Sequence, residues 1–220
     1  MSSRSESDDL RQSLLQAAED WYHVPALLLA AAWMFWVRMQ SYSNFLQNGE
    51  VFFSGNDAWY HLRQTTYTAR NFPSVMPFDI WTGFPVGQFA GQFGTLYDQL
   101  IALVALIVGL GSPSDQLIGK ALLVAPPVFG ALAVFPVYFL GKRFGNRISG
   151  LFGVGLLALL PGGFLQRTLV GGADHNAAEP FFMALAMVGL FGAVAAANRT
   201  MPVWEVVYEE VVENRKLDTI

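Results

Sequence analysis

The sequence contains no cysteine and has few charged residues. The absence of cysteine excludes disulfide bonds and thiolate metal ligands. Charged residues make up 14% of the 220-residue chain and hydrophobic residues 53%, whereas an average soluble domain has roughly 25% charged residues. The mean hydropathy is +0.37. This composition predicts an integral membrane protein, and the net charge of −4 without a basic patch indicates no nucleic-acid partner.

Long apolar stretches predict an all-α polytopic membrane protein in the cell membrane. The polar segment 1–20 lacks the order of regions found in a signal peptide, so we expect the first apolar stretch to be retained. Segment 96–110 has about 15 residues, fewer than the roughly 20 needed to span a bilayer, and contains Asp98. We expect it to be an interfacial helix. The predicted spans are about 21–41, 118–140, 148–165 and 177–197.

Basic residues predict which loops share a side of the membrane. The short loop between the second and third spans carries Lys142, Arg143 and Arg147 and no acid. The positive-inside rule makes this loop cytoplasmic. With a cytoplasmic amino terminus, the loops 43–117 and 166–177 are external and the segment 198–220 is cytoplasmic.

Two acidic clusters lie in these external loops, one around Asp57 and the other around Asp174. An aspartate beside membrane-length apolar runs is costly unless it meets water, a partner or a cation. Carboxylates are the hard donors that suit Mg²⁺ or Mn²⁺, so the two residues are candidates for one metal site. Helix capping is an equal alternative for both aspartates. The neighbouring His61 and His175 are more typical of interfacial or core histidines.

Two further features of the external loops each allow a functional and a purely structural interpretation. Arg167 lies at the outer end of the third span, where it can either snorkel to the interface or hold a carboxylate by a bidentate pair. The loop 43–117 is rich in aromatic residues, glycine and proline. Aromatic side chains suit the headgroup layer, although the same loop could instead pack on further helices.

In their order and spacing, these residues resemble the amino-terminal part of the catalytic subunit of oligosaccharyltransferases, in its archaeal form. The resemblance extends over roughly residues 20–197. The motifs that carry it are Asp57-Ala58-Trp59-Tyr60-His61, Trp81-Thr82-Gly83-Phe84-Pro85-Val86-Gly87, Arg167-Thr168, Gly171 and Asp174-His175-Asn176.

The resemblance implies a large-type (GT-C) glycosyltransferase transmembrane domain, here partial, with a long external loop after the first helix. It implies transfer of an oligosaccharide from a dolichol-phosphate-linked carrier to asparagine in Asn-X-Ser/Thr acceptors, with Mn²⁺ or Mg²⁺ at the outer membrane face. Asp57 then corresponds to a metal ligand that interacts with the acceptor amide. Asp174 corresponds to a second ligand, Asn176 to a third, and Arg167 to an arginine near the acceptor carboxylates.

Two departures from the family pattern stand out. Asn176 occupies a position where Asp, Glu or His is usual, so it brings a carbonyl without a charge. The chain also ends at Ile220 without the Trp-Trp-Asp-Tyr-Gly motif of the family, so we expect a fragment with no transferase activity of its own. The alternatives are another polyprenyl-phosphate-sugar transferase, such as a protein mannosyltransferase, or a non-catalytic membrane subunit or transporter piece.

Overall fold

The computed structural model describes residues 20–89 and 94–199 and the single positions 12, 202, 204, 205 and 208. The predicted cytoplasmic segments 1–20 and 198–220 therefore lie largely outside the described residues. The chain divides into two compact units. The site unit comprises Met34–Leu132 and Leu160–Phe182, and the hairpin unit comprises Met1–Trp33, Ala133–Leu159 and Met183–Ile220.

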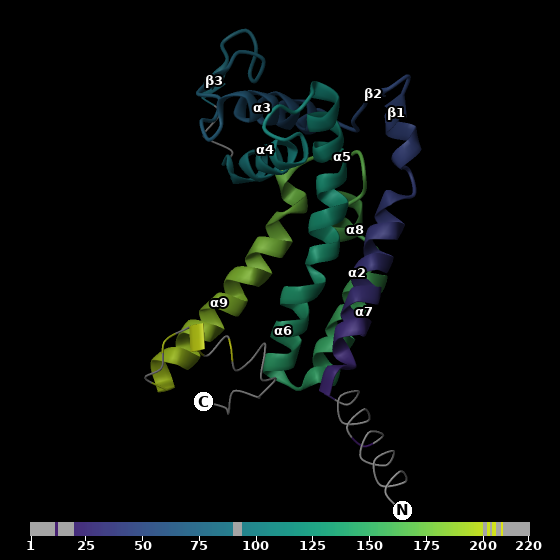
Figure 1. Cartoon of the computed structure of the whole chain (residues 1–220), viewed down its shortest axis with the longest axis vertical. Coiled ribbons are helices and arrows are strands. Elements are labelled where there is room, and N and C mark those ends of the chain that lie inside the picture. The colour runs from purple at the N-terminus through teal and green to yellow at the C-terminus, as the bar shows by residue number, and fades with distance from the viewer. Residues whose placement is uncertain are drawn as a thin grey trace, which may run out of the picture. The chain divides into compact units, whose positions relative to one another are not determined.

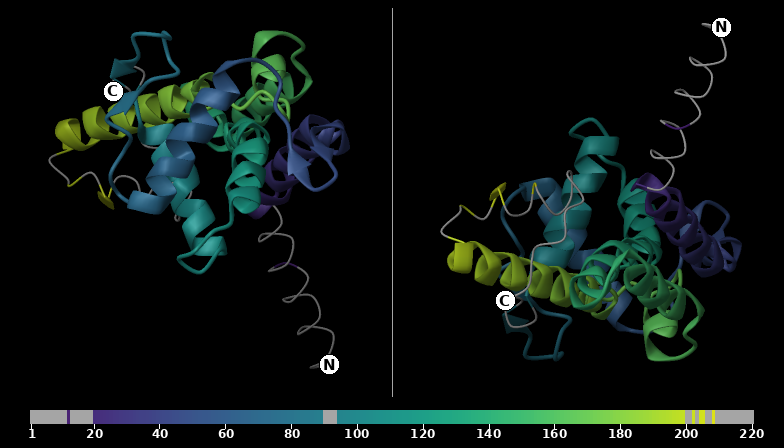
Figure 2. Two further views of the ribbon diagram at one scale, coloured as in Figure 1. Left: turned by 90° about the horizontal axis from the view of Figure 1, so that it is seen from above. Right: turned by 90° about the horizontal axis from the view of Figure 1, so that it is seen from below.

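The site unit is built mainly on three helices. These are α3 (Asp57–Asn71), α4 (Leu96–Val108) and α5 (Asp115–Leu132). In Figure 1, α3 and α4 lie side by side across one end of α5, and the view from above in Figure 2 shows α3 (blue) over α4 (teal). The unit also contains the short helices η1 (Tyr42–Phe45), α8 (Gly163–Arg167) and η3 (His175–Ala177).

The sequence of α3 explains why this helix packs on α4. Its buried residues recur at helical spacing along one face and are mostly small or polar: Ala58, His61, Gln64, Thr65, Thr68 and Ala69. The buried face of α4 consists of Tyr97, Asp98, Ile101, Ala102 and Ala105. Small side chains on both helices allow their backbones to approach closely, and the polar side chains then need partners inside the interface.

Two short antiparallel hairpins shape the external segment. Strands β1 (Leu46–Gln47) and β2 (Glu50–Val51) pair, and so do β3 (Phe78–Asp79) and β4 (Gln88–Phe89). Asn48 and Gly49, between β1 and β2, have positive φ angles of 52° and 87°. Two consecutive residues of positive φ are the requirement of a type I′ hairpin turn, which Asn-Gly favours.

The hairpin unit contains α6 (Val134–Phe144) and α7 (Arg147–Leu159) as neighbouring helices. Glycine permits their close approach: a Cβ added to Gly141 would lie 2.8 Å from the Cα of Gly150. Asn146 ends the turn between them and accepts a hydrogen bond from the backbone N–H of Ser149 at 3.0 Å, as a helix N-cap does.

Two helical segments of the described chain are long and apolar enough to cross a membrane by length and composition: Asp115–Phe144 and Glu179–Ala197. The second belongs to α9 (Glu179–Arg199), and the first joins α5 to α6 with an interruption at Ala133. Shorter apolar helices are α2 (His23–Met39), α4 and α7.

The helices differ from the predicted spans most clearly at 148–165. Helix α7 ends at Leu159, two residues before Pro161. Proline disfavours helical backbone in the residue before it and offers no N–H, and Gly162 follows with a φ of 129°. The chain then begins a separate short helix, α8. The predicted interfacial segment 96–110 corresponds to α4, which ends at Val108.

Candidate functional site

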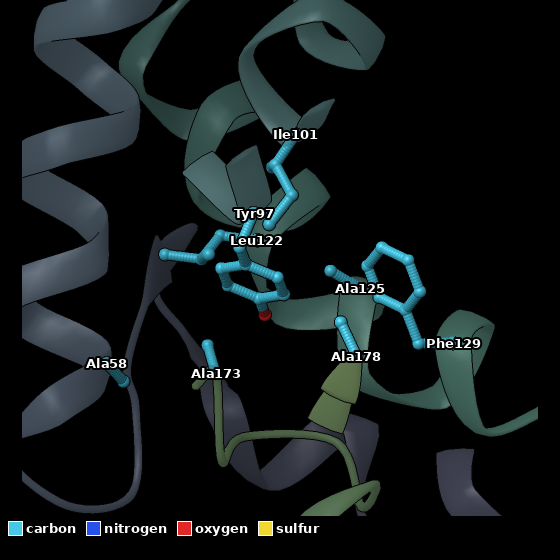
Figure 3. Packing of buried hydrophobic residues seen from close by; sticks show 8 residues of the cluster. All are labelled: Ala58, Tyr97, Ile101, Leu122, Ala125, Phe129, Ala173 and Ala178. Atoms are coloured by element: carbon cyan, nitrogen blue, oxygen red, sulfur yellow. The ribbon is translucent and has the colours of Figure 1, made fainter. Parts of the chain in front are cut away.

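Both acidic motifs are attached to one hydrophobic core. Ala58 follows Asp57 and is 2% exposed, while Ala173 precedes Asp174 and is 0% exposed. Both alanines belong to the buried cluster drawn in Figure 3, in which Ala173 lies on the side of the Tyr97 ring that carries the hydroxyl. The cluster consists of Ala58, Tyr97, Ile101, Leu122, Ala125, Phe129, Ala173 and Ala178. Because a buried neighbour fixes the backbone on each side, the core holds the two acids in defined places.

Asp57 is the first residue of α3 and is exposed. The preceding N-cap residue is Asn56, whose side chain makes no capping hydrogen bond. A carboxylate in the first turn is favoured by the positive end of the helix dipole. Asp57 therefore faces solvent from a helix end and is available to a ligand.

Arg167 is the last residue of α8, and the residue after it fixes this end of the helix. Thr168 is fully buried, donates a hydrogen bond to the carbonyl of Phe164 at 2.6 Å and accepts one from Nε of Arg38 at 2.8 Å. The N–H of Val170 donates to the carbonyl of Arg38 at 3.1 Å. The buried Arg38 thus holds the segment on which the exposed Arg167 stands.

The structure brings Asp57, Arg167 and Asp174 to the wall of a single hollow of about 190 Å³. The rest of the wall comes from residues next to them in the chain: Ser54, Gly55, Asn56, Ala58, Gln166, Gly172 and Ala173. Two parts of the chain that are far apart in the sequence, 54–58 and 166–174, therefore place two carboxylates and a guanidinium around a space large enough for a few polar atoms.

Asp174 has a capping role in addition to its place in the hollow. It is the N-cap of η3 and accepts a hydrogen bond from the backbone N–H of Asn176 at 3.3 Å. The side-chain amide of Asn176 also donates to Asp174. In this orientation the amide nitrogen of Asn176 faces the carboxylate, so a role as a metal ligand requires the amide to turn its carbonyl oxygen inward.

Two histidines, His61 and His175, lie against Asp174, although their sequence context is typical of interfacial or core histidines. Nδ1 of His175 lies 2.8 Å from Oδ1 of Asp174, and Nε2 of His61 lies 3.6 Å from the same oxygen. The three residues offer one ligand atom each, and these atoms all lie within 4.8 Å of one another. The spacing of His61 four residues after Asp57 on α3 was the sequence signal that could have indicated a shared face.

The pKa values of this group reflect burial and close contact. Burial lowers the pKa of His61, but the carboxylates of Asp174 and Asp98 outweigh it and raise the pKa to about 9. Burial raises the pKa of Asp174, but interactions with His61 and Asn176 outweigh it and hold the pKa far below its ordinary value. Asp174 is therefore a carboxylate throughout the physiological range, as a metal ligand must be.

Asp174 is the member of this group that fits a divalent cation. Carboxylate oxygens suit Mg²⁺ and Mn²⁺, whereas imidazoles suit borderline transition metals and ligate a metal only when they are neutral. The raised pKa keeps His61 protonated at neutral pH, so His61 is a neighbour of Asp174 rather than a ligand. His61 and Asp57 also line a second hollow of about 470 Å³, together with Trp81 and His175. This second hollow leaves space beside Asp57 for further oxygen ligands, such as those of a phosphate.

A buried ion pair holds the loop beside the second hollow. Asp79 is 2% exposed and accepts a hydrogen bond from Nη2 of Arg63 at 2.6 Å. Its carboxylate also accepts from the hydroxyl of Thr82 at 2.8 Å and from the N–H of Trp81 at 3.0 Å. Four donors on one carboxylate, counting the 3.2 Å bond from Nε of Arg63, fix the place of Trp81 in the wall of the hollow.

Comparison with known proteins gives a consistent result. The family described as oligosaccharyl transferase STT3, N-terminal, matches residues 26–207. The dolichyl-monophosphooligosaccharide–protein glycotransferase AglB of Haloferax volcanii is 60% identical over 195 residues, which are 89% of this chain and 18% of that protein.

Solved structures of an Archaeoglobus fulgidus oligosaccharyltransferase share the fold. The structure tethered to an acceptor peptide with the NVT sequon has a TM-score of 0.71 and 29% identity, over 82% of this chain and 21% of that one. The structure in complex with zinc and sulfate has a TM-score of 0.67 and 30% identity, over 78% of this chain and 21% of that one. The chain thus spans about a fifth of the length of these relatives.

Proposed function

Because the chain belongs to the oligosaccharyl transferase STT3 family, we propose that it forms part of a membrane enzyme of protein N-glycosylation. The enzyme would transfer an oligosaccharide from a dolichol-phosphate-linked carrier to the asparagine of Asn-X-Ser/Thr acceptors. The observation that carries the proposal is the convergence of Asp57, Arg167 and Asp174 on one hollow in a chain 60% identical to a dolichyl-linked glycotransferase.

The transfer reaction changes three bonds at this site. The amide nitrogen of the acceptor asparagine bonds to the anomeric carbon of the first sugar, and the bond from that carbon to the phosphate oxygen breaks. The proton that the amide loses goes to the departing phosphate or to solvent. Asp57 would accept a hydrogen bond from the amide N–H and so orient its nitrogen. Arg167 would hold a carboxylate in place by a charge-assisted hydrogen bond.

We propose Asp57, Asp174 and Asn176 as the residues of this chain that hold Mn²⁺ or Mg²⁺. When bound, the cation would neutralise the charge that develops on the phosphate leaving group. The depressed pKa of Asp174 keeps the carboxylate charged for this purpose. The Asn176 amide, already in contact with Asp174, would contribute its carbonyl oxygen after rotation.

We further propose a multi-pass arrangement with the hollow on the external face. The basic residues Lys142, Arg143 and Arg147 near the turn between α6 and α7 favour a cytoplasmic position for that turn. The site residues lie on segments that the charge rule assigns to the other side. The exposed aromatics Trp81 and Phe84 are typical of the interface, where a lipid-linked carrier would be met.

A chimeric transferase tests the proposal. In it, this chain replaces the segment of the Haloferax volcanii relative that it matches, and glycosylation of an acceptor peptide is measured. We expect activity in the parent chimera and a loss of at least about 100-fold in Asp57→Ala and Asp174→Ala. Asp115→Ala is the matched control, because Asp115 is an exposed acid outside the 190 Å³ hollow, paired with Arg70.

The outcomes distinguish a role of Asp57 and Asp174 in an enzyme site from a role as structural helix caps. If Asp57 and Asp174 serve only as helix-end residues, their alanine variants will lower thermal stability and leave transfer per folded molecule unchanged. A chimera without any transfer, although folded in the membrane, would contradict the proposed function itself.

A further inference from the structure

A histidine–carboxylate pair is buried between α3 and α4, directly behind the proposed site. His61 and Asp98 are each 1% exposed, and Nδ1 of His61 lies 2.9 Å from Oδ1 of Asp98. The hydroxyl of Thr65 donates to the same oxygen at 3.1 Å. The imidazole and the carboxylate thus restrain each other, and Thr65 restrains the carboxylate from the next turn of α3.

The other ring nitrogen of His61 faces the second acidic motif. Nε2 lies 3.2 Å from Nδ1 of His175 and 3.6 Å from Oδ1 of Asp174. The backbone N–H of His175 donates to Nε2 at 3.4 Å. One imidazole therefore joins three parts of the site unit: α4 through Asp98, α3 through its own backbone, and the 174–175 segment through its outer nitrogen.

Such a pair is an expensive way to pack two helices. Buried ionisable groups lose hydration that their mutual attraction often fails to recover, and apolar residues of similar volume are frequently as stable or more so. The neighbouring interface positions are filled by small apolar residues such as Ala69, Ala102 and Ala105. The pair lies where His61 contacts Asp174, and this placement indicates a purpose other than stability.

We propose that Asp98 is a positioning residue that acts through His61 on Asp174 and His175, and so fixes the second acidic motif relative to Asp57 at the start of α3. This inference rests on the proposed function, which it deepens. Asp98 holds the Nδ1 side of the ring, and this contact turns Nε2 toward the 174–175 segment. Outer partners that orient the groups holding a metal are a common feature of metal sites.

The test uses the chimeric transferase, purified in detergent, with Asp98→Asn as the main variant. Asparagine keeps the shape of the side chain and removes its charge. Two measurements are made: Mn²⁺ affinity by electron paramagnetic resonance, and amide hydrogen exchange of the peptide 173–178. We expect Mn²⁺ affinity to fall about 10-fold and exchange in 173–178 to rise by up to about 10-fold, with little change in α5.

Thr68→Val is the matched control. Thr68 is fully buried on the same face of α3, two turns beyond His61, and its hydroxyl has no hydrogen-bond partner among the described residues. Valine has the same shape, so the helix interface is altered without any contact with the site. Mn²⁺ affinity and the exchange of 173–178 should remain within about 2-fold of the parent.

A second variant separates positioning from packing. In His61→Phe/Asp98→Leu both polar groups are replaced by apolar ones, which should preserve the thermal stability of the chimera while lowering Mn²⁺ affinity as Asp98→Asn does.

Parent-like Mn²⁺ affinity and parent-like exchange of 173–178 in Asp98→Asn would overturn the inference and leave the proposed function intact. If the parent chimera binds no Mn²⁺ and transfers no glycan, the proposed function fails, and the exchange of 173–178 still decides whether Asp98 positions that segment.

Discussion

The interior of the site unit and the interior of the hairpin unit are stabilised by different kinds of contact. In the described part of the chain, every buried polar or charged side chain except those of His23 and Lys142 belongs to the site unit. The hairpin unit instead relies on close packing, with Gly150 against Tyr138 and Gly141 against Gly150. His23 stacks on Tyr138 with ring centroids 5.4 Å apart and planes within 6° of parallel.

This difference shows that the hydrogen bonds between buried side chains are concentrated in the site unit. Hydrogen-bonded polar groups fix orientation at a cost in desolvation, and they concentrate where orientation matters, beside the two acidic motifs. Small residues fix only distance, which suffices for a pair of helices such as α6 and α7. The comparison predicts that substitutions in the site unit change chemistry more than stability, and that those in the hairpin unit do the reverse.

The largest expected effect concerns Arg167, which lines the 190 Å³ hollow and is exposed. In the chimeric transferase, Arg167→Ala should lower the rate of glycan transfer by on the order of 100-fold, because a charge-assisted contact is lost. Thermal stability should be unchanged, since the buried Thr168 and Arg38 still hold the end of α8.

Arg167→Lys sharpens this prediction, because lysine keeps the charge but lacks the planar fork of the guanidinium. If Arg167 only snorkels to the interface, the lysine variant will transfer glycan as fast as the parent, and so will the alanine variant. Retention of activity in both would remove Arg167 from the proposed site.

The second effect lies in the hairpin unit. A Cβ at Gly150 would lie 2.7 Å from the ring and from the carbonyl oxygen of Tyr138, so Gly150→Val should lower the free energy of unfolding by about 1–3 kcal/mol through overpacking. Gly155→Ala on the same helix is the control, because nothing lies within 4 Å of its added Cβ. Alanine there should stabilise the helix by about 0.5–1 kcal/mol. Equal effects of the two variants, measured by denaturant unfolding, would contradict a glycine-packed hairpin.

Local sequence properties are enough to predict that the two acidic motifs share one side of a membrane. The charge of the loop that contains Lys142 and Arg143 assigned the two acidic motifs to one side, and the structure places Asp57, Arg167 and Asp174 around one hollow. Membrane length and basic residues are properties of local sequence, so they are readable without knowledge of tertiary contacts. The type I′ turn at Asn48-Gly49 is another such local property.

The buried contacts behind the site could not be predicted from the sequence. In the sequence, Asp98 is only a polar residue within a short apolar segment, yet it pairs with His61, 37 positions earlier. A single acid among apolar residues is compatible with an interface, a cap or a buried partner, and only the packing of α3 on α4 decides among these. The end of α7 at Leu159 was predictable in kind, since Pro161 and Gly162 follow, but the apolar residues continue to Leu165 and obscured it.

The smallest effect tests whether polar contacts of the site unit also support stability. Asp79→Asn removes the charge that pairs with Arg63, and we expect the free energy of unfolding to fall by about 1–2 kcal/mol. This estimate lies below that for a fully buried pair because the side chain of Arg63 is 32% exposed. Asp115→Asn is the control, because the Arg70–Asp115 pair has the same 2.6 Å distance but is exposed on both sides, and it should change stability little.

The loss of unfolding free energy in Asp79→Asn should depend on pH in a defined direction. Burial raises the pKa of Asp79, but hydrogen bonds from Arg63, Thr82 and the N–H of Trp81 outweigh it and lower the pKa below its ordinary value. A folded pKa below the unfolded value of about 3.9 means that the stabilisation is complete above that pH and is lost as the pH falls through the folded value. The unfolding free energies of the parent and of Asp79→Asn should therefore differ at pH 6 and converge below about pH 4. A difference that persists unchanged in acid would show that the asparagine acts through packing of the loop rather than through the lost charge.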